Sequence, residues 1–270
     1  MYKTITSKDN STLKYYQSLH DSRKALREGL VYIEGMRLCE DCLSSGVKPS
    51  VLLFTSKQKS LAESWDSKYE LGERIEYVEL TEECFNKLAS TVNPQGVAMI
   101  IRMQDCNVEH YDENSSLPVR EGRNVYVVLE NLQDPGNLGT ILRMADAFDF
   151  TAVLMTKDSV DPFNEKVLRA SMGSVWHLPI CIFENSDRIC DVLDENQVNK
   201  YAAHLKGTEL KDNCFKFPAA YFIGNEGKGL TDSTSERCDY KIKIRMPGKA
   251  ESLNAASAAS IIGYLMSSAE

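Results

Sequence analysis

The stretch NVYVVLENLQDPGNLGTILRMADAF, residues 124–148, predicts a strand that runs through a short turn into a helix. Its apolar beginning, 124–132, is typical of a strand in a parallel sheet, where both faces are buried. Apolar residues then recur at helical spacing, which predicts a helix over 137–148 with one buried face. Because strands and helices alternate in this way in α/β proteins, the stretch predicts that fold class.

The same alternation continues through the second half of the chain and predicts a mostly parallel sheet. Ligands of such sheets bind beyond the carboxyl ends of the strands. The expected strands cover 124–132, 152–156, 178–183, 200–204, 219–224 and 240–246, and the expected helices cover 137–148, 163–172, 186–195, 230–236 and 253–267.

The first half also alternates strands with helices, so we expect a smaller α/β domain there. Its expected strands cover 30–35, 51–56, 75–80 and 96–103, and its expected helices cover 11–28, 36–46 and 81–90. The polar stretch 105–122 contains Asn, Ser, Pro and Gly and is the expected linker. The 270 residues then divide into domains 1–104 and 123–270, near the usual domain size of about 100–200 residues.

The turn at 133–139 has the glycines of a phosphate-binding loop but lacks its Lys-Ser or Lys-Thr ending. No Asp-rich strand end supplies magnesium either, which excludes a phosphate-loop hydrolase. Asn137 stands at the expected helix start, where a short amide side chain caps well, and Arg143 lies inside the helix. A plain cap with a solvated arginine is the alternative interpretation at this point.

Two later strands also end in unusual loops. FIGNEGKGL, residues 222–230, places three glycines directly after a strand, which permits close approach of the backbone to a ligand or a simple tight turn. Glu226 among these glycines is not needed for a turn. IRMPGKAESLNAASAAS, residues 244–260, leads into a helix of small residues that Ser252 or Asn254 could cap, and an ordinary core helix explains it equally well.

Composition narrows the classes of protein. The net charge of −8 argues against a general nucleic-acid binder, although an RNA enzyme with a local basic patch is compatible with it. No run approaches about 18 apolar residues and no signal segment is visible, so we expect a cytoplasmic protein without a membrane partner. The eight cysteines are expected to be reduced core thiols. Cys39 and Cys42 lack a second ligand pair, so we expect no metal.

Together the three loops resemble the three motifs of the SpoU/TrmH branch of the SPOUT RNA methyltransferases. The matching patterns are N-x-G-x-x-x-R, G-N-E-G-x-G-L and I-x-M-x-G-x-x-E-S-L-N, and the resemblance covers about 124–267. The segment YIEGMRLCEDCLSSGVKPSVLLF in the first half is similar to the L30e-like substrate-binding domain of rRNA-modifying members. Two positions depart from the family pattern, with Asp149 in place of the usual Gly and Arg245 in place of Pro.

The resemblance implies an α/β fold with a trefoil knot and a bent S-adenosylmethionine held by the two later loops. The residues implied to bind the cofactor are Gly224, Asn225, Gly229, Ile244, Met246 and Leu253. The implied reaction is methyl transfer to a ribose 2′-hydroxyl of RNA. The implied catalytic residues are Arg143, Asn137, Glu226, Ser252 and Asn254.

Within this set the resemblance implies that Arg143 stabilises the developing alkoxide and anchors phosphate, because arginine almost never deprotonates. Asn137 and Asn254 would orient the ribose and the loops, and Glu226 would hold Arg143 or the knot. The family also implies a homodimer. The first domain favours large-subunit rRNA as substrate, and the alternatives are a tRNA 2′-O-methyltransferase or a non-catalytic RNA-binding or ribosome-assembly protein.

Overall fold

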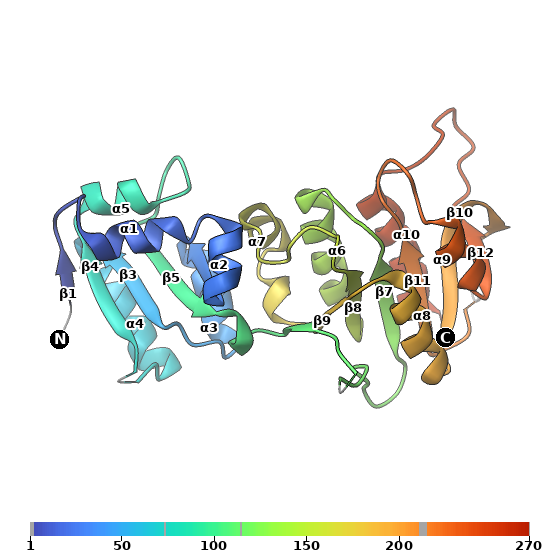
Figure 1. Cartoon of the computed structure of the whole chain (residues 1–270), viewed down its shortest axis with the longest axis horizontal. Helices are drawn as coiled ribbons and strands as arrows, with labels where there is room; N and C mark the ends of the chain where they lie inside the picture. The colour runs from blue at the N-terminus through green and yellow to red at the C-terminus, as the bar shows by residue number, and fades with distance from the viewer. Residues whose placement is uncertain (1–2, 73, 114, 211–214, 270) are drawn as a thin grey trace. The chain divides into compact units, whose positions relative to one another are not determined.

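The computed structural model describes residues 3–72, 74–113, 115–210 and 215–269. The chain divides into two compact units, Met1–Cys106 and Asn107–Glu270, and each unit is built around one sheet (Figure 1). Within the described ranges, no helix is long and apolar enough to cross a membrane. Both units are of the α/β class, as predicted.

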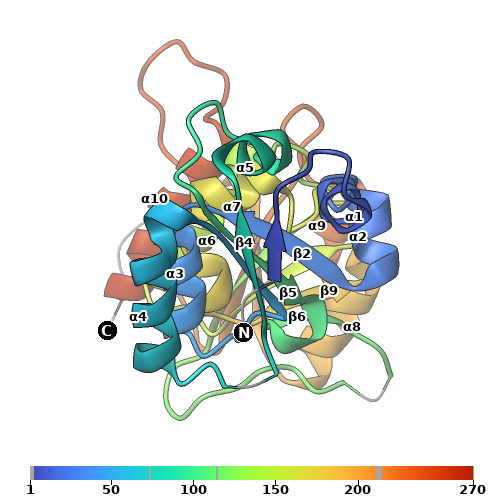
Figure 2. The ribbon, with the colours of Figure 1, turned by 90° about the vertical axis from the view of Figure 1, so that its left-hand side faces the viewer.

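The first unit has a mixed sheet of order β1-β4-β3-β5-β2, in which β5 runs antiparallel to β3 and β2. Helices α1 and α5 pack over one face, and α3 and α4 lie on the other (Figure 2). The elements are β1 (Lys3–Ile5), α1 (Ser11–Ser18), α2 (Ser22–Glu28), β2 (Leu30–Glu34), α3 (Met36–Ser44), β3 (Val51–Thr55), η1 (Ser56–Gln58), α4 (Lys59–Tyr69), β4 (Glu76–Leu80), α5 (Glu82–Leu88), β5 (Val97–Arg102) and η2 (Met103–Asp105).

Three local predictions for this unit were incomplete. The helix expected over 11–28 is broken, because the Asp21 side chain accepts a hydrogen bond from the Lys24 N–H at 3.0 Å and starts a second helix. Strand β1 and helix α4 were missed. Helix α4 is mostly polar and buries only Ala62 and Trp65, so its apolar signal is weak.

The second unit has a sheet of order β12-β10-β11-β7-β8-β9-β6 in which every strand pair is parallel, which confirms the predicted parallel sheet. The trefoil knot stays a prediction. The elements are β6 (Val108–His110), β7 (Val125–Leu129), α6 (Pro135–Ala147), β8 (Ala152–Thr156), α7 (Glu165–Ser171), η3 (Ser174–Trp176), β9 (Ile180–Phe183), α8 (Ser186–Glu195), β10 (Asn199–Glu209), β11 (Ala219–Ile223), α9 (Asp232–Arg237), β12 (Tyr240–Lys243) and α10 (Ala255–Ser268).

Part of the segment expected to be a linker belongs to this sheet. Strand β6 pairs with β9, with Val108 opposite Ile180. Strand β10 is also longer than expected, because it continues past a register shift between Ala203 and Thr208 in its pairing with β12. Both extensions lie at or next to the edges of the sheet, where the sequence carries fewer apolar residues than in the central strands.

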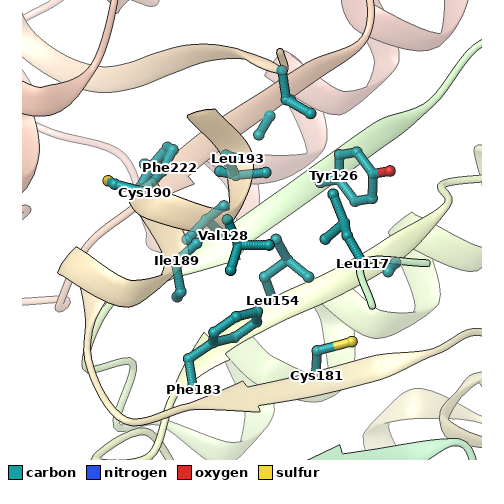
Figure 3. Packing of buried hydrophobic residues seen from close by; sticks show 14 of the residues in the cluster. Leu117, Tyr126, Val128, Leu154, Cys181, Phe183, Ile189, Cys190, Leu193 and Phe222 are labelled. Carbon is teal, nitrogen blue, oxygen red and sulfur yellow. The ribbon is translucent and has the colours of Figure 1, made fainter. Parts of the chain in front are cut away.

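The core of the second unit lies on both faces of its sheet. Helix α8 packs Ile189, Cys190 and Leu193 against Val128 and other strand residues, as Figure 3 shows. Fully burying each aliphatic side chain of this kind contributes about 1.5–3 kcal/mol. Helices α6, α7 and α10 pack together on the other side, so the helix that follows β7 is held firmly in place.

Candidate functional site

A cavity of about 320 Å³ opens in the second unit where β10, β11 and β12 meet the start of α10. Every residue predicted to bind the cofactor lines this cavity, and so do Glu226 and Ser252. The lining residues are Ala203, His204, Leu205, Ile223, Gly224, Asn225, Glu226, Gly227, Lys228, Gly229, Ile242, Lys243, Ile244, Met246, Ser252, Leu253, Ala255, Ala258 and Ile262. The two later glycine-bearing loops therefore converge on one hollow, although they are separated in sequence.

The loop after β11 is folded tightly back on itself. Asn225 and Gly229 exchange backbone hydrogen bonds of 3.1 and 2.8 Å, and the Asn225 side chain accepts from the N–H groups of Gly227 and Lys228. A Cβ atom on Gly224 would lie 2.1–2.3 Å from backbone atoms of Gly229 and Leu230. Position 224 therefore requires glycine for close backbone approach, which accounts for part of the motif.

Glu226 joins this loop to the beginning of α6. Its carboxylate accepts hydrogen bonds from the backbone N–H groups of Gln133 at 3.1 Å and Asp134 at 2.8 Å. It also accepts from the Asn137 side-chain amide at 3.0 Å. The prediction that Glu226 holds Arg143 finds no support in these contacts, because the carboxylate binds the start of the helix and not the arginine.

Asn137 does not cap α6, so the alternative interpretation of this residue as a plain cap is wrong. Asp134 is the cap, because its carboxylate accepts from the Asn137 N–H at 2.8 Å, and Pro135 occupies the first turn. The Asn137 side chain is instead 7% exposed, donates to Glu226 and accepts from the Asn254 side-chain amide at 2.8 Å. Sequence alone favoured the cap because a buried amide with distant partners has no local signature.

Asn254 completes the cluster and also caps α10. Its side-chain oxygen accepts from the N–H groups of Ala256 and Ser257 at 2.9 and 3.1 Å, while its amide group donates to Asn137. The cap is therefore Asn254 and not Ser252, which lies on the cavity wall. Hydrogen bonds through Glu226, Asn137 and Asn254 thus connect all three motif loops.

Burial and hydrogen bonding shift the pKa of Glu226 in opposite directions. Partial burial pushes the pKa of its carboxyl group up, but the hydrogen bonds from Asn137 and from the backbone outweigh that effect and hold the pKa below its ordinary value. The group is therefore ionised at neutral pH. An ionised carboxylate accepts these hydrogen bonds more strongly than a neutral group would.

Arg143 lies apart from the cluster. It is exposed on α6, does not line the cavity, and has no hydrogen bond or ion pair with any residue in the described ranges. Gly139, on the same helix, lies against α7, where an added Cβ atom would come within 2.4 Å of the Ala170 side chain. The glycine of this first motif therefore serves close helix packing, which positions Arg143 along with the rest of α6.

Sequence reasoning missed a second carboxylate at the end of β7. Glu130 is 3% exposed and accepts from the hydroxyls of Ser186, Thr231 and Thr234 at 2.9, 2.9 and 2.5 Å. It also accepts from the Thr231 N–H at 2.8 Å. The only available signal was a charged residue directly after an apolar strand.

The cavity fits an adenosylated amino acid. Its volume of about 320 Å³ falls at the lower end of the usual range for small-ligand pockets, about 300–1,000 Å³. Ile223, Ile244, Met246 and Ile262 provide apolar wall, and the loop 224–229 presents backbone polar groups. This combination suits a nucleoside with a polar tail, held mainly by backbone and apolar contacts.

Known proteins share both parts of the chain. Residues 124–264 match the SpoU rRNA Methylase family, and residues 10–99 match the MRM3-like substrate binding domain. The chain is similar to the 23S rRNA (guanosine(2553)-2′-O)-methyltransferase RlmP of Bacillus subtilis, with 30% identity over 97% of this chain and 98% of the relative. It is also similar to the 23S rRNA (uridine(2479)-2′-O)-methyltransferase of Streptomyces viridochromogenes, with 28% identity over 97% of this chain and 91% of the relative.

A solved structure extends the likeness to three dimensions. The AdoMet-bound rRNA methyltransferase from Sinorhizobium meliloti superposes with a TM-score of 0.82 and 26% identity, covering 98% of this chain and 97% of that one. The family match spans the three motif loops and the cavity that the two later loops surround. The chain therefore belongs to the SpoU rRNA methylase family and is a methyltransferase that uses S-adenosylmethionine.

Proposed function

We propose that this enzyme methylates a ribose 2′-hydroxyl in 23S-type rRNA. The observation that carries the proposal is the hydrogen-bonded cluster of Glu226, Asn137 and Asn254, which connects the three motif loops beside the cavity. Two relatives named as 23S rRNA 2′-O-methyltransferases, each matched over 97% of this chain, support the substrate class. The substrate-binding match at 10–99 supports recognition of RNA by the first unit.

The bound cofactor would supply an electrophilic methyl group, so the residues of the chain must orient the hydroxyl and assist loss of its proton. We assign to Arg143 the stabilisation of the developing alkoxide, since its guanidinium keeps its charge and has no partner within the described ranges. Glu226 and Asn137 act as positioning residues, because their polar atoms are used in holding the start of α6. We assign to Ser252, which lies on the cavity wall, contact with the ribose.

A homodimer would bring Arg143 to a cavity. Within one chain the arginine is exposed on α6 and does not line the cavity, and we propose that a second copy places it beside bound cofactor. Helix α10, which packs against α6, exposes Ile261 and Tyr264, with 38% and 58% of their surfaces accessible. Burial of these apolar side chains would favour association. We assign the protein to the cytoplasm, where ribosomal RNA is modified.

The test is a map of ribose methylation by mass spectrometry in rRNA and tRNA from a strain that lacks the gene. We expect one 2′-O-methyl group to disappear from 23S-type rRNA and to return when the wild-type gene is restored. Loss of a methyl group from tRNA instead would support the tRNA alternative. No loss from either RNA would contradict the proposal and support a non-catalytic protein.

Complementation with Arg143→Ala tests the assigned role of the arginine. We expect the methylation rate to fall by about 100- to 1,000-fold, as happens when a charge-stabilising donor is removed from an active site. Arg169→Ala, on the neighbouring helix α7, is the control, because Arg169 forms an ion pair with Glu165 on its own helix. Full activity of the Arg143→Ala enzyme would contradict the role.

A further inference from the structure

Three basic side chains line the cavity from three neighbouring strands. Lys228 follows β11, His204 belongs to β10, and Lys243 ends β12. Because these strands are parallel and adjacent in the sheet, their carboxyl ends meet at one edge, where all three residues line the same cavity. We call this set, His204, Lys228 and Lys243, the basic rim.

The basic rim has no anionic partner among the residues that the structure describes. Lys228 and Lys243 are exposed, and neither side chain forms an ion pair or hydrogen bond within the described ranges. The acidic side chain that lines the cavity, Glu226, is turned toward the start of α6 and accepts its hydrogen bonds there. The rim therefore presents uncompensated positive charge on a chain whose net charge is −8.

His204 adds a hydrogen-bond donor to this rim. Its Nδ1 atom accepts from the backbone N–H of Lys206 at 3.1 Å, so Nδ1 carries no proton. In the neutral ring the proton then lies on Nε2, which makes that atom a donor. A cavity edge with two ammonium groups and one imidazole N–H is complementary to an anion with several oxygen acceptors.

We propose that the basic rim binds a phosphodiester group of the RNA next to the nucleotide that is methylated. The inference rests on the proposed function, because a ribose presented at the cavity necessarily brings its flanking phosphates with it. Exposed lysines at the edge suit a ligand that arrives from solvent, whereas the inner wall is formed by Ile223, Ile244 and Ile262. Local positive charge also offsets the repulsion between RNA and an acidic protein.

The sequence supplies a matched control for the two lysines. Lys206 and Lys241 are also exposed, lie on β10 and β12, the strands that carry His204 and Lys243, and do not line the cavity. The variants K228Q/K243Q and K206Q/K241Q therefore remove the same charge from neighbouring positions. An effect confined to K228Q/K243Q reports on the cavity edge and not on overall charge.

The experiment measures binding of 23S-type rRNA, purified from a strain that lacks the gene, to the full-length enzyme at saturating S-adenosylmethionine and several salt concentrations. For K228Q/K243Q we expect affinity to fall about tenfold or more. We also expect the slope of log affinity against log salt concentration to become less steep, by the amount that corresponds to about one phosphate contact. K206Q/K241Q should change each quantity much less.

Three results would overturn the inference. They are an unchanged salt slope for K228Q/K243Q, an equal or larger effect of K206Q/K241Q, and loss of S-adenosylmethionine affinity without loss of RNA affinity. The last result would assign the rim to the carboxylate of the cofactor. Ribose methylation by the wild-type enzyme is measured on the same preparations by mass spectrometry. If the wild-type enzyme methylates no ribose, the proposed function fails; if it does methylate a ribose, the three results above bear on the basic rim alone.

Discussion

Two carboxylates follow neighbouring strands of the second sheet, and each binds the segment that follows the other strand. Glu130, directly after β7, accepts hydrogen bonds from Thr231 at the start of α9, which comes after β11. Glu226, after β11, accepts from Asp134 and Asn137 at the start of α6, which comes after β7. This exchange ties together two strand ends that are adjacent only in the folded protein.

Their surroundings separate the two carboxylates. Glu130 is 3% exposed and its partners are three hydroxyls and one backbone N–H. Glu226 is exposed and lines the cavity, and one of its partners is the amide of Asn137. We infer that the buried carboxylate, Glu130, mainly stabilises the fold. The carboxylate on the cavity wall, Glu226, mainly supports the reaction, because a ligand can reach its surroundings.

The largest effect should come from Glu130→Ala. The substitution leaves the buried hydroxyls of Ser186, Thr231 and Thr234 without their common acceptor, so we expect a loss of about 3–5 kcal/mol in the free energy of unfolding. Denaturant unfolding measures it. Glu236→Ala, at an exposed position of α9, should change the free energy by about 0.5 kcal/mol or less. Equal effects of the two substitutions would remove the structural role from Glu130.

Glu226→Gln, unlike Glu130→Ala, should lower methylation more than it lowers the free energy of unfolding. A Gln side chain has one acceptor oxygen for the two backbone N–H groups and the Asn137 amide, and its own N–H₂ group faces a donor. We expect methylation to fall at least about tenfold while the free energy of unfolding falls by about 1 kcal/mol. If Glu226→Gln lost as much free energy of unfolding as Glu130→Ala and kept normal activity per folded molecule, the two carboxylates would not differ in role.

The same variant predicts a pH dependence. The pKa of Glu226 is lowered in the folded protein, so its contribution to stability is present above the ordinary glutamate pKa of about 4.3 and is lost as pH falls through the lowered value. Unfolding free energies of wild type and Glu226→Gln should therefore converge as the pH is lowered from neutral into this range. A constant difference across that range would contradict the ionised state of Glu226.

Gly224→Ala tests whether the loop that carries Glu226 is as tightly built as its contacts indicate. The added Cβ atom would lie 2.1–2.3 Å from the backbone of Gly229 and Leu230, so the loop must shift, at a cost of about 1–3 kcal/mol. We expect weaker S-adenosylmethionine binding in calorimetry. Gly248→Ala is the control, because nothing lies within 4 Å of a Cβ atom there. Equal binding by both variants would show that the loop adjusts freely.

A third carboxylate, Asp149, lies before β8 at the amino end of the sheet and should show the smallest effect. It has a positive φ of 54°, which glycine adopts at less cost, and it forms an ion pair with Arg120. Asp149→Gly relieves the cost of the positive φ and removes the ion pair with Arg120, and these effects oppose each other. The free energy of unfolding should therefore change by less than about 1 kcal/mol. A larger loss in thermal or denaturant unfolding would mean that the pair with Arg120 is stronger than a surface ion pair.

Sequence and structure agree best where the signal is local. The strand 124–132 and the helix 137–148 could be predicted because apolar spacing depends only on neighbouring residues. Three of the four observed ends of β7 and α6 lie within two residues of the predicted ones. The break before α2 was missed, because the competition between one helix and two depended on a single side chain, Asp21.

The motifs assigned the predicted site residues to three loops but did not reveal the hydrogen-bond partners of these residues. A plain helix cap was the alternative interpretation of Asn137, which instead connects Glu226 with Asn254. Of the two roles considered for Glu226, holding Arg143 or holding the knot, the contacts do not support the first. Glu130 and the basic rim carried at most a weak sequence signal, a charged residue after an apolar strand in the case of Glu130. In each case the contact joins residues that are far apart in the chain.

The α/β class and most strands and helices of the second half follow from the sequence alone, because apolar periodicity acts over a few residues. The loops that would surround a cofactor were indicated by the resemblance of their motifs to those of the family. Only the tertiary structure decided which carboxylate is enclosed and which faces the cavity, and which basic side chains meet at its edge. The order of strands in the sheet brings β7, β10, β11 and β12 together, and that order depends on packing over the whole unit.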